Sequence, residues 1–249
     1  MSVNIKYKNN SIAELTDTGT KTLKTAGKYC EADIIVENTK DGGGAKEPYI
    51  EETYNSDGQL TSAVMHGHLA IRNQAFFECR SLTSVVMPSN ITRIGYDAFK
   101  GCLSLTSITI PDSVTDIGNS AFMGCDSLTS ITIPSGVTSI EDHTFSCCGL
   151  MSVVIPDSVI GIGVDAFGMN EFTSITIPSS VKFINFTAFN NCRSLTSVTF
   201  NGTPISVQDN IFNDCQDLTT INVPWAEGVV SGAPWGATNA TINYNYTGA

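Results

Sequence analysis

The sequence predicts a β-rich solenoid, because one unit of 22 or 23 residues recurs along most of the chain. A fixed period in this range is typical of proteins built from stacked repeats. Seven units have an aliphatic residue five positions before a phenylalanine. In most units a proline ends the apolar run with which the unit begins. The units begin at Leu60, Leu82, Leu105, Leu128, Leu150, Phe172, Leu195 and Leu218.

One unit, residues 105–126, illustrates the expected path of the chain. Leu105 to Ile110 alternates apolar residues with small β-formers, which predicts a strand with one buried face. Pro111 stops ladder pairing. Ile117 is expected to point back into the coil, Gly118 to allow a tight corner, and Phe122 to fill the interior. A single unit cannot cover its own apolar face, so it is stable only when it is stacked on neighbours.

The repeated pattern L-T-S-I-T-I-P-x-S-V-x-x-I-G-x-x-A-F-x-x-C resembles the BspA-type, or Treponema-type, leucine-rich repeat. The resemblance covers residues 60–224. It implies a leucine-rich-repeat right-handed superhelix of about seven to eight repeats, with a parallel sheet along one face that serves binding or display. It brings no catalytic residues, and it implies neither a cofactor nor a metal.

Residues 1–39 form a separate small β module in this interpretation. Val3, Ile5 and Tyr7 alternate with polar residues, and three or four short strands are expected. The segment N-I-K-Y-K-N-N-S-I-A-E-L-T-D-T-G-T-K-T-L-K-T-A-G-K-Y-C-E-A-D-I-I-V is similar to the amino-terminal segment of proteins encoded in tail regions of prophages of gut Firmicutes. A module of this size rarely folds alone. It is therefore either an anchor, through self-association or a virion protein, or a cap on the first repeat.

The remaining boundaries follow from composition. Residues 40–59 are a glycine-rich linker and lead-in, residues 60–224 are the repeats, and residues 225–249 are a carboxy-terminal cap rich in aromatic residues. The last coil of a solenoid exposes an apolar end and an unpaired strand edge, so a cap is expected there. The alternative is a terminal contact surface. Its residues would be Trp225, Trp235, Tyr244 and Tyr246.

Charge and hydropathy limit the possible partners. The net charge is −11, and residues 47–249 carry six basic and eighteen acidic residues. Phosphates would be repelled by this acidic body, which argues against nucleic acid. No apolar run approaches the roughly 20 residues of a membrane helix, so we expect no membrane insertion. The start lacks the pattern of a signal peptide. We therefore expect a virion protein, or one that is extracellular after lysis.

Most of the eight cysteines recur at one position of the unit, three residues after the repeat phenylalanine. Cys147 or Cys148 fills this position in a shortened copy. We expect a row of buried free thiols that act as small hydrophobes. A disulfide stays open as an alternative, because stacked positions lie within the Cα range for one. No C-x-x-C motif supports a zinc site.

Two rows of small residues are expected to face outward from the strands and form a candidate binding face. The alternative is that their hydroxyls only satisfy one another along the sheet. The face comprises Ser107, Thr109, Ser130, Thr132, Ser152, Val154, Ser174, Thr176, Ser197 and Thr199.

Other polar residues do not assemble into a recognised catalytic motif. Asp97, Asp116, Asp142 and Asp165 are expected on a solvated edge. His66 and His68 form an H-x-H pair that could share a metal, but a polar corner in an irregular end repeat is the favoured interpretation. With no HExxH motif and no predicted Ser, His and Asp cluster, the sequence indicates no enzyme.

The sequence thus predicts a non-enzymatic binding or display protein. A prophage tail-associated or fibre-like structural protein, whose rod contacts a protein partner or cell-surface ligand, is the preferred hypothesis. A bacterial surface adhesion or host-interaction protein of the BspA type is the alternative.

Overall fold

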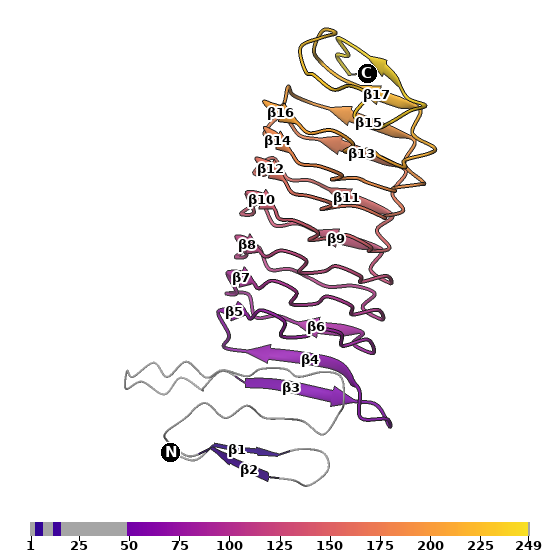
Figure 1. Cartoon of the computed structure of the whole chain (residues 1–249). Coiled ribbons are helices and arrows are strands. Elements are labelled where there is room, and N and C mark those ends of the chain that lie inside the picture. The colour runs from indigo at the N-terminus through magenta and orange to yellow at the C-terminus, as the bar shows by residue number, and fades with distance from the viewer. Residues whose placement is uncertain (1–2, 7–11, 16–48, 249) are drawn as a thin grey trace.

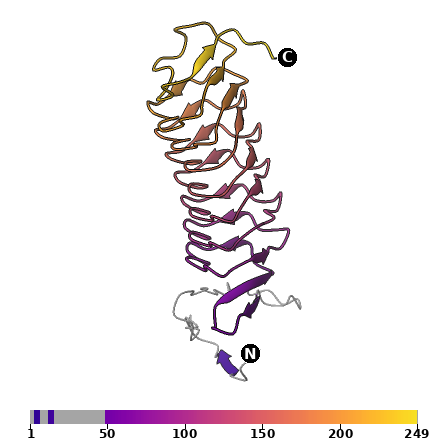
Figure 2. The same ribbon diagram turned by 90° about the vertical axis from the view of Figure 1, so that its right-hand side faces the viewer.

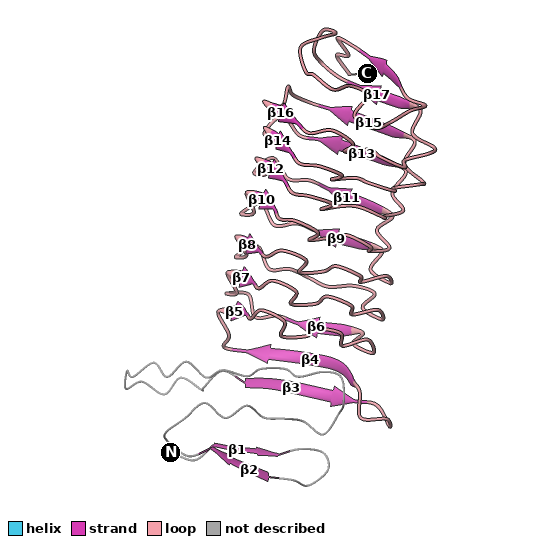
Figure 3. Ribbon diagram, in the orientation of Figure 1, coloured by secondary structure: helices cyan, strands magenta, loops and turns pink. Residues whose placement is uncertain are grey.

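The computed structural model describes residues 3–6, 12–15 and 49–248. Residues 49–248 wind into a β-solenoid of about eight turns stacked into a rod (Figure 1), which a second view confirms (Figure 2). Figure 3 shows only strands and loops in the described parts of the chain. The predicted β-rich solenoid is therefore confirmed.

Two ladders of strands run along the rod. The longer strands define what we call the long-strand face, and the two-residue strands define the short-strand face. The first ladder contains β4 (Leu60–His66), β6 (Ser84–Val86), β9 (Ser130–Thr132), β11 (Ser152–Val154), β13 (Ser174–Ile177), β15 (Ser197–Phe200), β17 (Thr220–Asn222) and β18 (Thr241–Asn243). The second contains β5 (Ala70–Ile71), β7 (Arg93–Ile94), β8 (Asp116–Ile117), β10 (Ser139–Ile140), β12 (Gly161–Ile162), β14 (Phe183–Ile184) and β16 (Ser206–Val207).

Pairing between turns is parallel and joins equivalent residues. Ser174 of β13 lies opposite Ser197 of β15, and the register continues through Thr220 to Thr241. Every repeat position therefore forms a column along the rod. The ladders are interrupted in places. On the long-strand side the sheets run β3 (Tyr49–Tyr54)-β4-β6, β9-β11 and β13-β15-β17-β18, and on the other side they run β5-β7-β8 and β10-β12-β14-β16.

One unit departs from the expected path. Residues 105–110, predicted as a strand, contain no strand, although Ile108 and Ile110 are buried as predicted. The apolar side chains hold this copy in place while the ladder of backbone hydrogen bonds skips it. Val114 and Ile117 both point into the core, as expected from their spacing.

The centre of the solenoid is a column of phenylalanine rings. Consecutive rings stack with centroids 5.1 to 5.7 Å apart and planes within 26° of each other. Each ring therefore covers the ring of the turn before it. Each ring also removes its full apolar surface from water, which is the main source of stability in such a core. The column is Phe76, Phe99, Phe122, Phe145, Phe167, Phe189 and Phe212.

The turns beside this column also pair with their neighbours through the backbone. Asp97 N donates to Asn119 O at 3.0 Å, and Phe99 N donates to Ala121 O at 2.7 Å. This pairing depends on residues with positive φ two positions before and two positions after the phenylalanine, such as Asp97 and Gly101. Most of these residues are not glycine. The stacking of neighbouring turns therefore has to offset their backbone strain.

The described ends of the rod differ. At the amino-terminal end, β3 (Tyr49–Tyr54) pairs antiparallel with β4. At the other end β18 extends the parallel sheet beyond β17, as the alternation of residues 241–246 predicts. Of the predicted amino-terminal strands, β1 (Val3–Lys6) and β2 (Ile12–Leu15) form an antiparallel pair. The other strands expected there lie outside the described residues.

Replacing Phe122 by alanine tests the ring column. Phe122 is fully buried between Phe99 and Phe145, so its removal should open a void and lower the free energy of unfolding by about 3–5 kcal/mol. Urea denaturation followed by circular dichroism would measure the loss. Thr132→Ala is the matched control, because Thr132 is exposed on β9 and should change stability by less than about 0.5 kcal/mol. Equal losses would contradict the assignment of inward and outward faces.

Candidate binding surfaces

The long-strand face presents the predicted rows of small residues to solvent. Eight of the ten predicted residues are exposed, while Ser197 and Thr199 are half-buried. The outward orientation of the rows is therefore confirmed, and their role in binding stays a prediction. The rows also include one large apolar side chain, Val154, which is 80% exposed next to Met151 at 68%.

The alternative prediction, that these hydroxyls satisfy one another, is wrong. Among the ten residues only the Thr199 hydroxyl takes part in a side-chain hydrogen bond with a described residue, as acceptor from Asn222 Nδ2 at 3.2 Å. Turn-to-turn bonds come instead from a neighbouring column. Thr83 Oγ1, for example, donates to the backbone oxygen of Thr61 at 2.9 Å. The hydroxyls of the predicted face other than that of Thr199 thus have no side-chain partner among the described residues.

The aromatic residues near the carboxy terminus are mostly interior. Trp225 and Trp235 are 5% and 1% exposed, and both rings contact Phe200. The two indoles therefore cannot act as exposed contact anchors in this structure. Tyr244 and Tyr246 are half-buried, and a contact through them stays a prediction.

Buried cysteines line the core as a regular column. Cys102 Sγ donates to Phe76 O at 3.1 Å, and Cys125 Sγ donates to Phe99 O at 3.2 Å, so each thiol satisfies a carbonyl of the preceding turn. Cys148, rather than Cys147, fills this position in its shortened copy. Burial raises the pKa of the Cys102 thiol to about 12. This thiol is therefore protonated and unreactive at neutral pH.

The column has two exceptions. Cys79 is disulfide-bonded, so the prediction of free thiols is wrong for this residue. The described cysteines that are free are Cys102, Cys125, Cys147, Cys148, Cys192 and Cys215.

Asn170 replaces cysteine in the other exceptional turn, and its buried amide donates to Phe145 O at 2.8 Å and to Phe167 O at 2.9 Å. The Asn170 side chain therefore donates to backbone carbonyl groups as the thiols do, and its hydrogen bonds are stronger.

Stacking also assembles a cluster that the sequence did not predict. His143 and Asp165 are equivalent residues of adjacent turns, and His143 Nδ1 lies 3.3 Å from Asp165 Oδ2. Ser146 Oγ donates to the same carboxylate oxygen at 2.7 Å. The prediction of a solvated edge is therefore wrong for Asp165, whose side chain is only 14% exposed.

This cluster does not have the geometry of a nucleophilic triad. In such a triad the imidazole lies between the hydroxyl and the carboxylate. Here the Asp165 carboxylate lies between His143 and Ser146, and the Ser146 side chain is fully buried, so no substrate can reach its hydroxyl. Ser146 is not a nucleophile in this arrangement.

The H-x-H pair lies at the end of β4. His66 Nε2 lies 3.5 Å from Glu51 Oε1, and burial lowers the pKa of His68. Across residues 3–6, 12–15 and 49–248, no group of three or more His, Cys, Asp or Glu side chains is arranged to hold a metal ion.

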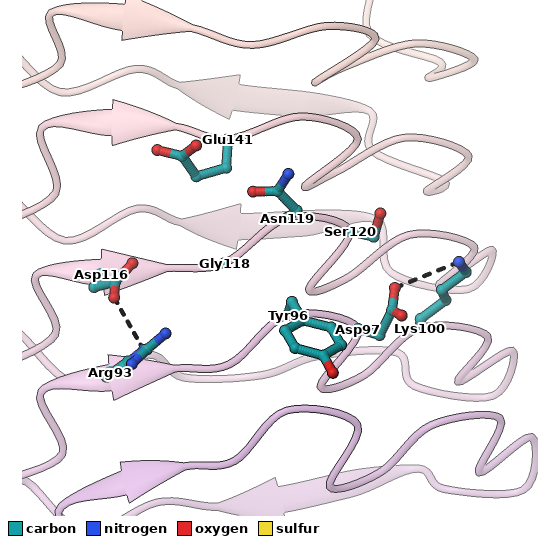
Figure 4. Close-up of a pocket in the computed structure, with 9 residues that line it drawn as sticks. All are labelled: Arg93, Tyr96, Asp97, Lys100, Asp116, Gly118, Asn119, Ser120 and Glu141. Atoms are coloured by element: carbon teal, nitrogen blue, oxygen red, sulfur yellow. Dashed lines mark ion pairs between the residues drawn. The ribbon is translucent and has the colours of Figure 1, made fainter.

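A hollow of about 540 Å³ lies on the short-strand face, over β7 and β8 (Figure 4). Its lining mixes cationic, anionic and amide side chains with one aromatic ring. Arg93 Nε lies 3.0 Å from Asp116 Oδ2, and Lys100 Nζ lies 3.4 Å from Asp97 Oδ1. The prediction of a solvated edge is confirmed for Asp116, which is exposed, and is wrong for Asp97, whose side chain is 19% exposed. The sequence did not predict that they lie together with Tyr96, Asn119 and Glu141, which also line the hollow. We call it the Tyr96 groove.

The family follows from the repeats that build these surfaces. The family model of the BspA type leucine rich repeat region matches residues 50–171 and 161–229. The chain belongs to the BspA-type leucine-rich repeat family. This family and its solenoid fold are typical of non-enzymatic binding scaffolds.

Several solved bacterial structures are similar to this BspA-type chain. A leucine-rich repeat protein from Bacteroides ovatus is 29% identical with a TM-score of 0.52, over 73% of this chain and 47% of that one. A leucine rich cell surface protein from Faecalibacterium prausnitzii is 25% identical with a TM-score of 0.47, over 75% and 71% of the two chains. The leucine rich repeat protein of T. pallidum is 26% identical with a TM-score of 0.41, over 70% and 81%.

The chain thus spans about half the length of the Bacteroides ovatus protein. No curated protein shows significant similarity to it. In the described part of the chain there is no helix with the length and apolar character needed to cross a membrane.

Thiol labelling tests the cysteine column. Cys147 is half-buried, whereas the other described free cysteines are buried, so Cys147 should react first with iodoacetamide in the native protein. Its reaction should still be slow, because burial raises the pKa of the Cys147 thiol. Peptide mass spectrometry after brief labelling would identify the modified residues, and urea-unfolded protein is the control for full reactivity. Equal native labelling of Cys125 and Cys147 would refute the interior position of the column.

Proposed function

We propose that the chain is a non-enzymatic display rod whose long-strand face contacts a protein or cell-surface ligand. One observation carries the proposal: two rows of small side chains point outward along the stack of turns, and eight of their nine hydroxyls make no side-chain hydrogen bond within the described chain. Membership of a family of binding scaffolds supports it. A flat face of this kind suits a broad contact more than a small ligand, which needs a concave site.

The biological setting of this rod is a further part of the proposal. The similarity of residues 1–39 to prophage tail-region proteins supports a tail-associated or fibre-like protein, with localisation in the virion or outside the cell after lysis. Residues 1–39 would then hold the rod on a larger assembly, through self-association or through a virion protein. The acidic body of the rod supports a partner other than nucleic acid. The alternative setting is an adhesion protein of the bacterial surface.

Binding of the labelled full chain to intact cells tests the face and its setting. The tail-associated function predicts binding to bacterial cells, and the adhesion function predicts binding to animal epithelial cells. The double variant Thr132→Lys and Thr176→Lys should reduce binding by about tenfold or more, because it places bulky charges on the contact face. Flow cytometry would measure the change.

The matched control for this experiment is Thr115→Lys with Thr138→Lys. It adds the same two positive charges at exposed positions on the short-strand side and leaves the long-strand face intact. Equal loss of binding in both variants, or wild-type binding by the double variant, would count against the long-strand face as the contact surface.

Light scattering after size exclusion tests the amino-terminal module. If residues 1–39 self-associate, the full chain should elute as an oligomer and residues 47–249 as a monomer. Thermal denaturation of the shorter chain would verify that it folds. Two monomers with the same melting curve would rule out an assembling module.

A further inference from the structure

One turn of the Tyr96 groove contributes no side chain to its lining, because Gly118 follows the core isoleucine of β8 there. The position follows the core isoleucine of β7 and β8, and it is glycine in both turns, Gly95 and Gly118. In the next turn the same column holds Glu141, whose side chain closes one end of the groove. The hollow therefore lies above Gly118, while Gly95 is buried beneath it.

Both glycines are required by the backbone beneath them. A Cβ on Gly95 would lie 2.4 Å from Asn73 N, and a Cβ on Gly118 would lie 2.7 Å from Tyr96 N. Asn73 Oδ1 also accepts a hydrogen bond from Tyr96 N at 3.1 Å. The groove thus has a rigid floor, and the backbone of Tyr96 is fixed at its side before any ligand arrives.

The walls combine an aromatic ring with polar groups of both kinds (Figure 4). Tyr96 is 46% exposed, and its hydroxyl makes no hydrogen bond with a described residue. Arg93 with Asp116 forms the wall beside the strands, while Asn119 lies beyond Gly118. Donors and acceptors therefore surround one accessible ring face.

The charges of the groove narrow the chemistry of its ligand. The two cations are each paired with a carboxylate, and Glu141 makes no ion pair within the described residues. An anionic ligand would meet this excess carboxylate and the acidic body of the rod. A cationic side chain could pair only with Glu141, because Asp116 and Asp97 already pair with Arg93 and Lys100, and it would leave the donors of the Asn119 amide without acceptors.

We propose that the Tyr96 groove binds a neutral saccharide unit. Sugar hydroxyls both donate and accept hydrogen bonds, so they match the mixed set of Asn119, Glu141 and the Arg93–Asp116 pair. The apolar C–H face of a pyranose packs on the Tyr96 ring. A volume of about 540 Å³ accommodates a short saccharide segment, with the open sides leaving room for the rest of a longer chain. The site is separate from the long-strand face and does not depend on the function proposed for it.

Titration of the full chain with neutral oligosaccharides tests the site. The probes are hexasaccharides of glucose, mannose, galactose and N-acetylglucosamine, with oligolysine and a sulfated hexasaccharide as charged comparisons. Saturation-transfer NMR should detect binding of at least one neutral probe. Tyr96→Ala should weaken that binding at least about tenfold, which corresponds to roughly 1.4 kcal/mol, whereas Tyr96→Phe should retain the ring contact.

Phe186→Ala is the matched control for Tyr96→Ala. Phe186 occupies the same column several turns away, is 51% exposed, and does not line the groove. Its removal should leave saccharide binding unchanged, and circular dichroism would confirm that both variants fold. Glu141→Gln, which keeps an acceptor and removes the charge, should weaken binding less than Glu141→Ala.

Three outcomes would overturn the proposal. One is the absence of binding to every neutral probe. Another is saccharide binding that Tyr96→Ala and Phe186→Ala change equally. The last is binding of oligolysine alone, lost in both Tyr96→Ala and Glu141→Gln, which would assign the groove to a basic peptide.

Discussion

No turn of this protein has a core of its own, so the stacking of turns is the constraint on which the structure depends. Each phenylalanine ring lies against the rings of the adjacent turns, and each core thiol donates to a carbonyl of the preceding turn. The apolar and the polar requirements of one turn are thus met by its neighbours. This mutual dependence holds the repeat positions in fixed columns along the rod.

Fixed columns separate the positions that maintain the fold from those that can vary. Inward columns accept few residue types: phenylalanine, leucine, isoleucine, valine, alanine, and cysteine or its replacement Asn170. Outward columns carry serine and threonine on one side and a wider range of residues on the other. A local surface therefore arises from the coincidence of residues in neighbouring turns. The Tyr96 groove, which Gly118 lines together with Tyr96 and Glu141 of the neighbouring turns, is an example.

The sequence predicted the features that depend on periodicity alone. Phe122 and Ile117 are buried, and Thr132 faces outward, because the position within the unit decides each of these outcomes. Features that depend on contacts between neighbouring columns were missed. The sequence pattern predicted a solvated carboxylate at Asp165. In the structure His143, which lies 22 residues earlier at the equivalent position of the adjacent turn, is beside it. The burial of Trp235 follows from a further turn at the carboxy-terminal end, which no repeat landmark announces. Aligning the units and comparing equivalent residues would have revealed that His143 lies beside Asp165 and that Gly95 and Gly118 occupy the same position of the unit.

The parallel register of equivalent residues has a consequence for how such a rod can change in length. Because each turn offers its successor the same column of partners, one unit of 23 residues can be duplicated or lost without altering the contacts on either side. Each event would move the two ends apart or together by about the spacing of adjacent phenylalanine rings, 5.1 to 5.7 Å. Recombination between repeats can therefore change the length of the rod in uniform steps, while the residues that fill its interior stay the same.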